Sequence, residues 1–307
     1  MAWKTSWFDV VGRALAPGDE RGVAQAIERL SGAFRAGSPL LGYEDAVTRQ
    51  GYLWHHLPAH VCDLTTLFLD VAELWAEREE LALLALGAGP GSEVLALGEA
   101  ICRKRERGEE VAARRVTATR VDRVSGWDAP FGPLLREAEA AWDQRDPARR
   151  DPQTGWTLAA APAALSWDLG ATRPPEPVRA AAAAADLVVL SNLLTELVPR
   201  GSEELPPVPA AGLAELLAVA RAGSAWLVLD RAGAPGAVER IEALAALAAA
   251  GPNPPRGVHG PRARHIRCGC ALTRRAKELY ELVHLPTTRV EDRPARNCHT
   301  AWCALVW

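Results

Sequence analysis

The chain has 307 residues, and 49% of them are hydrophobic, which is enough for one large core or for a main domain with a smaller appendage. Its formal net charge of -3 is not that of a protein that binds nucleic acid over its whole surface. Six cysteines in so long a chain do not indicate a disulfide scaffold, so we expect a reducing cytoplasm. The sequence has neither a long apolar stretch nor a signal-peptide core, so we expect no membrane span and no cleaved leader.

Residues 1–79 are expected to form a helical cap. Apolar residues recur at helical spacing over 18–36 and 43–77, and Pro58 divides the second stretch into two helices. Four tryptophans accompany these segments, namely Trp3, Trp7, Trp54 and Trp75. They either pack the helices onto the rest of the protein or line a substrate pocket, and packing is the role that we expect.

The pattern changes at residue 80, where a second domain, 80–307, is expected to begin. Short apolar runs cover 81–86, 115–122, 164–169, 185–192 and 224–230, and helical segments cover 92–107, 131–145, 209–222 and 235–250. Strands that alternate with helices predict a parallel sheet with helices on both faces. The Pro- and Gly-rich stretches 170–177 and 251–262 are expected to be loops. The final residues, HTAWCALVW, are expected to form an antiparallel edge strand.

A glycine-rich turn, Gly87-Ala88-Gly89-Pro90-Gly91, follows the first predicted strand. Glycine lets the backbone approach a ligand closely, and the helix that follows offers free N–H groups. The turn lacks the Gly-Lys-Ser/Thr ending of a phosphate-binding P-loop, and Ser92 stands where a dinucleotide fingerprint requires glycine. Two interpretations remain, a site for a nucleotide-like cofactor or a tight turn without a ligand.

Polar residues also end the later strands. Asp122 ends the second, Asp168 with Leu169 follows the third, and Ser191 with Asn192 ends the fourth. Taken alone, each polar residue is an ordinary strand terminus or helix cap. Because ligands of such sheets bind at the carboxyl ends of the strands, we expect these residues to lie beside the glycine turn.

Residues 81–230 contain this turn and these strand ends, and because of them they resemble the core of the class I methyltransferases, which use S-adenosylmethionine (SAM). The resemblance implies an α/β Rossmann-like class I methyltransferase sheet, and methyl transfer from SAM to a small metabolite or an RNA. Asp122 would bind the ribose hydroxyls, and Asp168 with Leu169 would flank the adenine. Ala85 stands where many members carry an acid. The residues assigned to SAM are Gly87, Ala88, Gly89, Gly91, Asp122, Asp168, Leu169, Ser191 and Asn192.

A narrower similarity concerns the methyltransferase-like proteins of small-ribosomal-subunit assembly in mitochondria, and their bacterial relatives. It is carried by LWHHLPAHVCDLTTLFLD, LGAGPGSE, ADLVVLSNLLTELVP and APGAVERIEALAAL. That family has a helical amino-terminal part, a SAM fold and cysteines that can hold an iron–sulfur cluster. The alternative function is therefore a non-catalytic assembly or binding factor that kept the SAM fold.

The carboxyl-terminal part contains Cys268, Cys270, Cys298 and Cys303. Four thiolates from two segments suit zinc or an iron–sulfur cluster. Neither pair has C-x-x-C spacing, however, and alternation on the last strand makes Cys303 a core residue. We therefore expect no metal, and we expect Cys62 and Cys102 to be core residues.

Two further features bear on the acceptor. Residues 256–296 contain ten Lys and Arg and four Asp and Glu, a stretch that either faces RNA phosphates or is a solvated surface. His55, His56 and Asn192 are candidates to assist an acceptor that must lose a proton.

Overall fold

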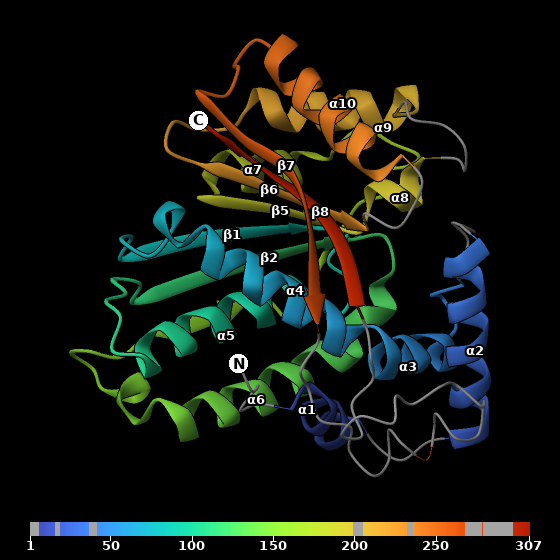
Figure 1. Ribbon diagram of the computed structural model, residues 1–307, viewed down its shortest axis with the longest axis vertical. Helices are drawn as coiled ribbons and strands as arrows, with labels where there is room; N and C mark the ends of the chain where they lie inside the picture. Colours follow the sequence, from blue (N-terminus) through green and yellow to red (C-terminus); the bar gives the residue numbers. More distant parts are fainter. Residues whose placement is uncertain are drawn as a thin grey trace.

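The computed structural model describes residues 6–15, 19–36, 42–198, 205–231, 236–267, 278 and 297–307. Within these ranges, eight strands form one sheet with helices on both faces (Figure 1). The strands are β1 (Glu80–Leu86), β2 (Arg115–Asp122), β3 (Thr157–Ala160), β4 (Leu165–Ser166), β5 (Leu187–Ser191), β6 (Ala225–Arg231), β7 (Gly257–Arg267) and β8 (Asn297–Val306).

The helices carry the labels of Figure 1. The α-helices are α1 (Trp7–Ala14), α2 (Glu20–Ala36), α3 (Ala46–His55), α4 (Leu57–Asp70), α5 (Ser92–Glu106), α6 (Asp128–Arg145), α7 (Glu176–Ala184), α8 (Leu194–Leu197), α9 (Pro207–Ala218) and α10 (Ala237–Ala250). Three short 3₁₀ turns are η1 (Ala72–Leu74), η2 (Ser125–Trp127) and η3 (Pro147–Arg150). As the sequence predicts, Pro58 separates α3 from α4, where it occupies the first turn of the second helix.

The strand order is β3-β2-β1-β5-β6-β8-β7, and the short β4 pairs with the end of β2. β1 pairs in parallel with both β2 and β5, so the chain builds outward from β1 in one direction and then in the other. β8 is antiparallel to both of its neighbours. This is a Rossmann-like α/β sheet with helices on both faces, and the fold class expected from the sequence is confirmed.

Successive side chains of each inner strand enter two different cores. In β5, Leu187 and Val189 belong to the first core, whereas Val188 and Leu190 belong to the second. The first core collects α1 to α6 on one face of the sheet, and the second collects α7, α9 and α10 on the other (Figure 1). Trp7, Trp54 and Trp75 are buried in the first core, while Trp3 lies outside the described residues.

Three local expectations are wrong. The last strand is not an edge strand, because β8 lies between β6 and β7. The stretch expected as a loop at 251–262 instead begins the edge strand β7 at Gly257. Gly260 and Pro261 resemble loop residues, but they lie where the register shifts between His259 and Arg262, and an edge strand tolerates proline there.

The third correction concerns 164–169, where the apolar run contributes only the two-residue strand β4. The strand that continues the sheet beyond β2 is β3, which pairs in parallel with the start of β2. β3 has the sequence TLAA, which is too short and too weakly apolar to stand out as a strand.

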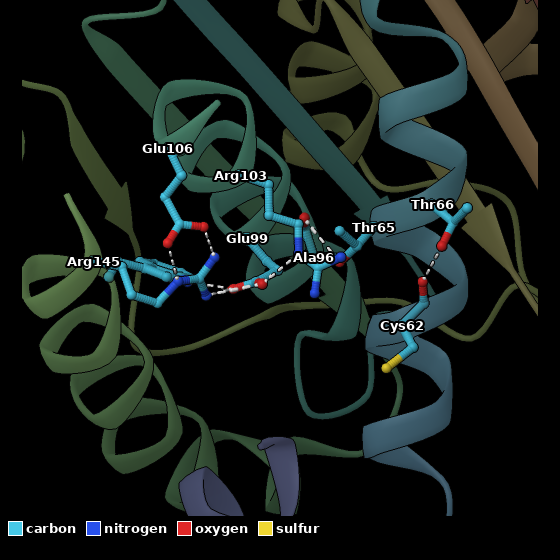
Figure 2. A network of polar contacts seen from close by, with 9 residues as sticks. Cys62, Thr65, Thr66, Ala96, Glu99, Arg103, Glu106 and Arg145 are labelled. Carbon is cyan, nitrogen blue, oxygen red and sulfur yellow. Dashed lines mark hydrogen bonds and ion pairs between the residues drawn. The ribbon is translucent and has the colours of Figure 1, made fainter. Parts of the chain in front are cut away.

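A buried polar network joins α5 to α6 (Figure 2). The carboxylate of Glu99 is fully buried and accepts hydrogen bonds from Arg103 Nε at 2.7 Å and from Arg145 Nη1 at 2.8 Å. The Trp142 indole N–H also donates to Glu99, at 3.1 Å. Arg145 continues the network to Glu106 at 2.7 Å, so the acid in the core is surrounded by donors.

Candidate functional site

The glycine turn connects β1 to α5, and its three glycines have positive φ angles. These are 65° at Gly87, 48° at Gly89 and 83° at Gly91, a region that glycine adopts without steric cost. A Cβ atom at Gly87 would also lie 2.8 Å from the side chain of Leu193, which follows β5. The turn therefore requires glycine for its shape.

Asp122 holds this turn from the end of β2. Its Oδ2 accepts a hydrogen bond from the Gly89 amide at 2.7 Å, and its Oδ1 accepts one from the Val124 amide at 2.8 Å. Burial raises the pKa of the Asp122 carboxyl, and the two backbone donors oppose that shift. Each carboxylate oxygen can accept a second hydrogen bond, so Asp122 can fix the turn and still accept from a ligand hydroxyl.

A cavity of about 490 Å³ opens beside this turn, a volume typical of small-molecule sites. It lies at the carboxyl ends of β1, β2 and β5, where the sheet order reverses. Ala88 and Gly91 are buried in the turn and do not line it. The sequence-assigned residues that line it are Gly87, Gly89, Asp122, Asp168, Leu169, Ser191 and Asn192.

Two backbone features shape the rest of the cavity rim. Asp168 Oδ1 accepts a hydrogen bond from the Gly170 amide at 3.0 Å, which orients the carboxylate after β4. Asn192 has a φ of 55°, a left-handed conformation that asparagine adopts more readily than most residues. Its own amide donates to the Leu229 carbonyl at 2.7 Å, which ties the end of β5 to β6.

Three aromatic residues that the sequence did not single out form one side of the cavity. Tyr43, Tyr52 and Trp127, called here the aromatic wall, have ring centroids 5.3 to 5.5 Å apart. A Cβ atom at Gly89 would lie 3.8 Å from the Trp127 ring, so the wall stands close to the glycine turn. The two tyrosines come from the amino-terminal helical region, and the spacing of apolar residues does not reveal that they reach this site.

A second residue missed from the sequence is Glu93, in the first turn of α5. Ser191, at the end of β5, donates a hydrogen bond from its Oγ to Glu93 Oε1. Glu93 is 1% exposed. Burial raises the pKa of this carboxyl to about 7, and the Ser191 bond opposes part of that shift. A carboxyl group that titrates near neutral pH therefore lies directly behind a cavity residue.

Of the candidates for proton transfer, Asn192 lines the cavity, whereas the buried His55 and His56 are not among the residues that do so. His55 is hydrogen-bonded through Nε2 to Ser31 Oγ at 2.6 Å. The imidazole connected to the cavity is that of His60, whose Nδ1 lies 2.8 Å from the Tyr52 hydroxyl oxygen. Sequence reasoning missed this pair because it joins residues of two helices.

The cysteines that the structure describes are core residues. Cys62, Cys102 and Cys303 are buried, and burial raises the thiol pKa of Cys102 and of Cys303 to about 12. Cys268 and Cys270 lie outside the described residues, as does most of the basic stretch 256–296, and the side chain of Cys298 is not described. Among the described residues, no group of three or more His, Cys, Asp or Glu side chains is arranged to hold a metal ion.

No known protein family and no curated protein matches this chain. Among solved structures, the [4+2]-cyclase SpnF is 15% identical over 80% of each chain, with a TM-score of 0.39. The YcgJ protein from Bacillus subtilis is 12% identical over 80% of this chain and 98% of that chain, with a TM-score of 0.35. Magnesium protoporphyrin IX methyltransferase (ChlM) from Synechocystis PCC 6803, solved with bound SAM, is 11% identical over 95% of this chain and 100% of that chain, with a TM-score of 0.36. No residue role follows from likenesses this distant.

Within the described ranges, no helix combines the length and the apolar character needed to cross a bilayer.

Proposed function

We propose that the protein is a SAM-dependent methyltransferase and that SAM binds in the cavity beside the glycine turn. The observation that carries this proposal is the convergence of the turn, Asp122, Asp168 and Ser191 on one cavity of about 490 Å³. These residues come from four different strand ends, and their convergence at the switch point of the sheet supports a nucleoside-like ligand. A turn that only connected a strand to a helix would not need polar side chains from three other strand ends beside it.

The chemistry of the lining residues fits each part of SAM. The backbone of Gly87 and Gly89 suits the methionine part, because no side chain intervenes. Asp122 has acceptor capacity beyond its two backbone bonds, as binding of the ribose hydroxyls requires. Asp168 supplies an acceptor for the adenine amino group, and the buried Leu169 supplies an apolar surface for its ring.

Methyl transfer from a sulfonium is a direct displacement, and bound SAM supplies the electrophilic methyl group. The work of this chain is to orient the two reactants and to exclude water. The aromatic wall contributes a flat apolar surface close to the glycine turn, which suits an acceptor that carries a planar ring. Such a ring belongs either to a small metabolite or to an RNA base.

For an acceptor that must lose a proton, we propose a route through Tyr52 and His60. Tyr52 lines the cavity, and its hydroxyl oxygen lies 2.8 Å from the His60 Nδ1 atom. A proton passed to the tyrosine oxygen can thus move onto a buried imidazole. An acceptor with a free lone pair would not use this route.

The test of cofactor binding uses calorimetry with SAM and the full chain. Gly89→Val places a branched side chain in the space between the turn and Trp127, where a Cβ atom meets only ordinary van der Waals contacts. We expect this variant to fold and to lose measurable SAM binding. Asp122→Ala removes charge-assisted bonds worth about 1.5–3 kcal/mol each, so the dissociation constant should rise at least about tenfold.

The matched control is Gly108→Val. Gly108 has a φ of 69° and no atom within 4 Å of a Cβ, so this variant carries similar backbone strain at an exposed position away from the cavity. We expect it to bind SAM like the wild type. Equal affinities for the wild type and Gly89→Val would overturn the assignment of the cavity to SAM.

Turnover is tested with tritium-labelled methyl-SAM and two cellular fractions, RNA and small molecules. Label in one fraction supports an enzyme and identifies the acceptor class. Tight SAM binding without label in either fraction would favour the alternative, a non-catalytic binding factor.

A further inference from the structure

Glu93 is a buried acid without a cationic partner in the described part of the chain. It is 1% exposed, and its Oε1 accepts the hydrogen bond from Ser191. Its Oε2 is also buried and has no hydrogen-bond partner among the described atoms. A carboxylate left in this state is costly, because burial without a counter-charge penalises the ionised form.

Charged groups of β2 act on the carboxyl of Glu93. β2 contributes Asp122, whose charge raises the pKa of Glu93, and Arg120, whose charge lowers it. The Arg120 guanidinium is paired with other groups, because it donates to Asp128 Oδ1 at 2.8 Å and to the Pro162 carbonyl at 2.6 Å.

Other elements contribute further groups. Ser191 of β5 bonds to Glu93 through its hydroxyl and is one of the residues that line the cavity. α6, which packs against α5, carries Asp128 and Arg145, which are paired with Arg120 and Glu99. α4, which packs along α5, carries the buried groups His60 and Asp63. β1 contributes the buried Ala85, which offers no charge.

Resting on the proposed function, we propose that Glu93 is the buried counter-charge for the positive charge of bound SAM, and that it releases its proton when SAM binds. Without ligand, the carboxyl group is about half protonated at pH 7 and fully protonated well below it. When the sulfonium cation enters the cavity, the ionised form is stabilised and the carboxyl proton passes to solvent. No heavy-atom bond forms or breaks in this step.

The geometry explains why Glu93 suits this role better than Asp122. Asp122 already accepts hydrogen bonds from two backbone amides, which stabilise its charge before any ligand arrives. Glu93 accepts one side-chain bond and retains an unpaired oxygen, so a ligand cation changes its environment more. Ser191 links Glu93 to the cavity, since its hydroxyl bonds to Glu93 and Ser191 is one of the residues that line the cavity. Glu93 is therefore a positioning residue that acts on the ligand through charge and through Ser191.

The experiment is calorimetry of SAM binding at pH 7 in buffers of different ionisation enthalpy, which counts the protons released. Because the pKa of Glu93 is about 7 without ligand, we expect the wild type to release up to about 0.5 proton per SAM. Glu93→Gln should release close to none. The SAM dissociation constant of the wild type should fall between pH 5.5 and 7.5, by up to about tenfold for each unit by which binding lowers the pKa, and that of Glu93→Gln should change little.

The matched control is Glu99→Gln, which alters the other fully buried glutamate of α5, away from the cavity. It should release protons like the wild type. S-adenosylhomocysteine, which lacks the sulfonium charge, should release fewer protons than SAM from the wild-type protein. Infrared difference spectra of the wild type provide a measurement without a variant, since the band of a protonated carboxyl should weaken when SAM binds.

The outcomes separate this proposal from the one on which it rests. If the wild type binds neither SAM nor S-adenosylhomocysteine, the proposed function itself fails. If SAM binds but the wild type and Glu93→Gln release equal numbers of protons, the role of Glu93 is wrong while the SAM site stands. Equal release with the two ligands, or an unchanged carboxyl band, would also overturn it.

Discussion

α5 buries two glutamates, one in its first turn and one at its middle, and the two differ in their partners. Glu99, at the middle of the helix, accepts hydrogen bonds from Arg103 and Arg145 (Figure 2) and from the Trp142 indole. Glu93, in the first turn, accepts a hydrogen bond from Ser191, and its Oε2 has no partner within the described part of the chain. A buried carboxylate that joins two helices needs hydrogen-bond donors and cations from the protein itself. A buried carboxylate behind a cavity can instead be stabilised in part by the charge of a bound ligand.

The largest expected effect comes from breaking the complete network. Arg145→Met removes the guanidinium that bonds to both Glu99 and Glu106, and it leaves a buried carboxylate with less compensation. We expect the free energy of unfolding to fall by about 3–5 kcal/mol, measured by urea denaturation at pH 7.

The control for that variant is Arg13→Met, which breaks the more exposed pair with Glu137. It should change the free energy of unfolding by no more than about 1 kcal/mol. A loss below about 1 kcal/mol for Arg145→Met would mean that Glu99 does not depend on its cations and that the contrast within α5 is false.

The next effect concerns the pH dependence of stability at Glu93. Its pKa is raised from 4.5 in the unfolded reference to about 7 in the folded protein, with burial as the main cause. The folded protein therefore holds a proton that the unfolded chain has released, and the free energy of unfolding falls as pH rises from about 4.5 to about 7. At about 1.4 kcal/mol per pKa unit, the total loss is about 3 kcal/mol.

Glu93→Gln removes this titration. Between pH 4.5 and pH 8, its free energy of unfolding should gain about 3 kcal/mol relative to the wild type, as measured by denaturation in the absence of ligand. If the difference between Glu93→Gln and the wild type is the same at both pH values, Glu93 does not carry a proton in the folded state.

The smallest effect tests the contact between the end of β5 and the first turn of α5. Ser191→Ala removes the side-chain hydrogen bond that Glu93 accepts, and this donor matters most when Glu93 is ionised. We expect a loss of about 1–2 kcal/mol in the free energy of unfolding at pH 8.5 and of less than about 1 kcal/mol at pH 5. Losses of equal size at both pH values would show that the bond does not favour the charged form.

Much of the fold follows from local patterns. The run RVTATRVD predicts a strand over 115–122, and the structure has β2 over the same residues. The helix expected at 92–107 is α5, which ends one residue earlier, at Glu106. These predictions succeed because apolar periodicity and glycine positions are properties of neighbouring residues. The strand β7 was missed because its Gly and Pro suit both a loop and a bulged edge strand, and only pairing with β8 decides between them.

The glycine turn, the polar strand ends and hence the type of sheet can be recognised from the order of the amino acids, because each depends on residues adjacent in the chain. The groups that surround the turn become visible only in the folded protein. The aromatic wall joins the cap region to η2, and the Ser191–Glu93 contact joins residues 98 positions apart in the chain. The same is true of the two acids of α5. Glu93 and Glu99 are alike in sequence, and their difference arises from the partners that β5 and α6 bring to them, since burial and pairing are set by contacts between distant segments.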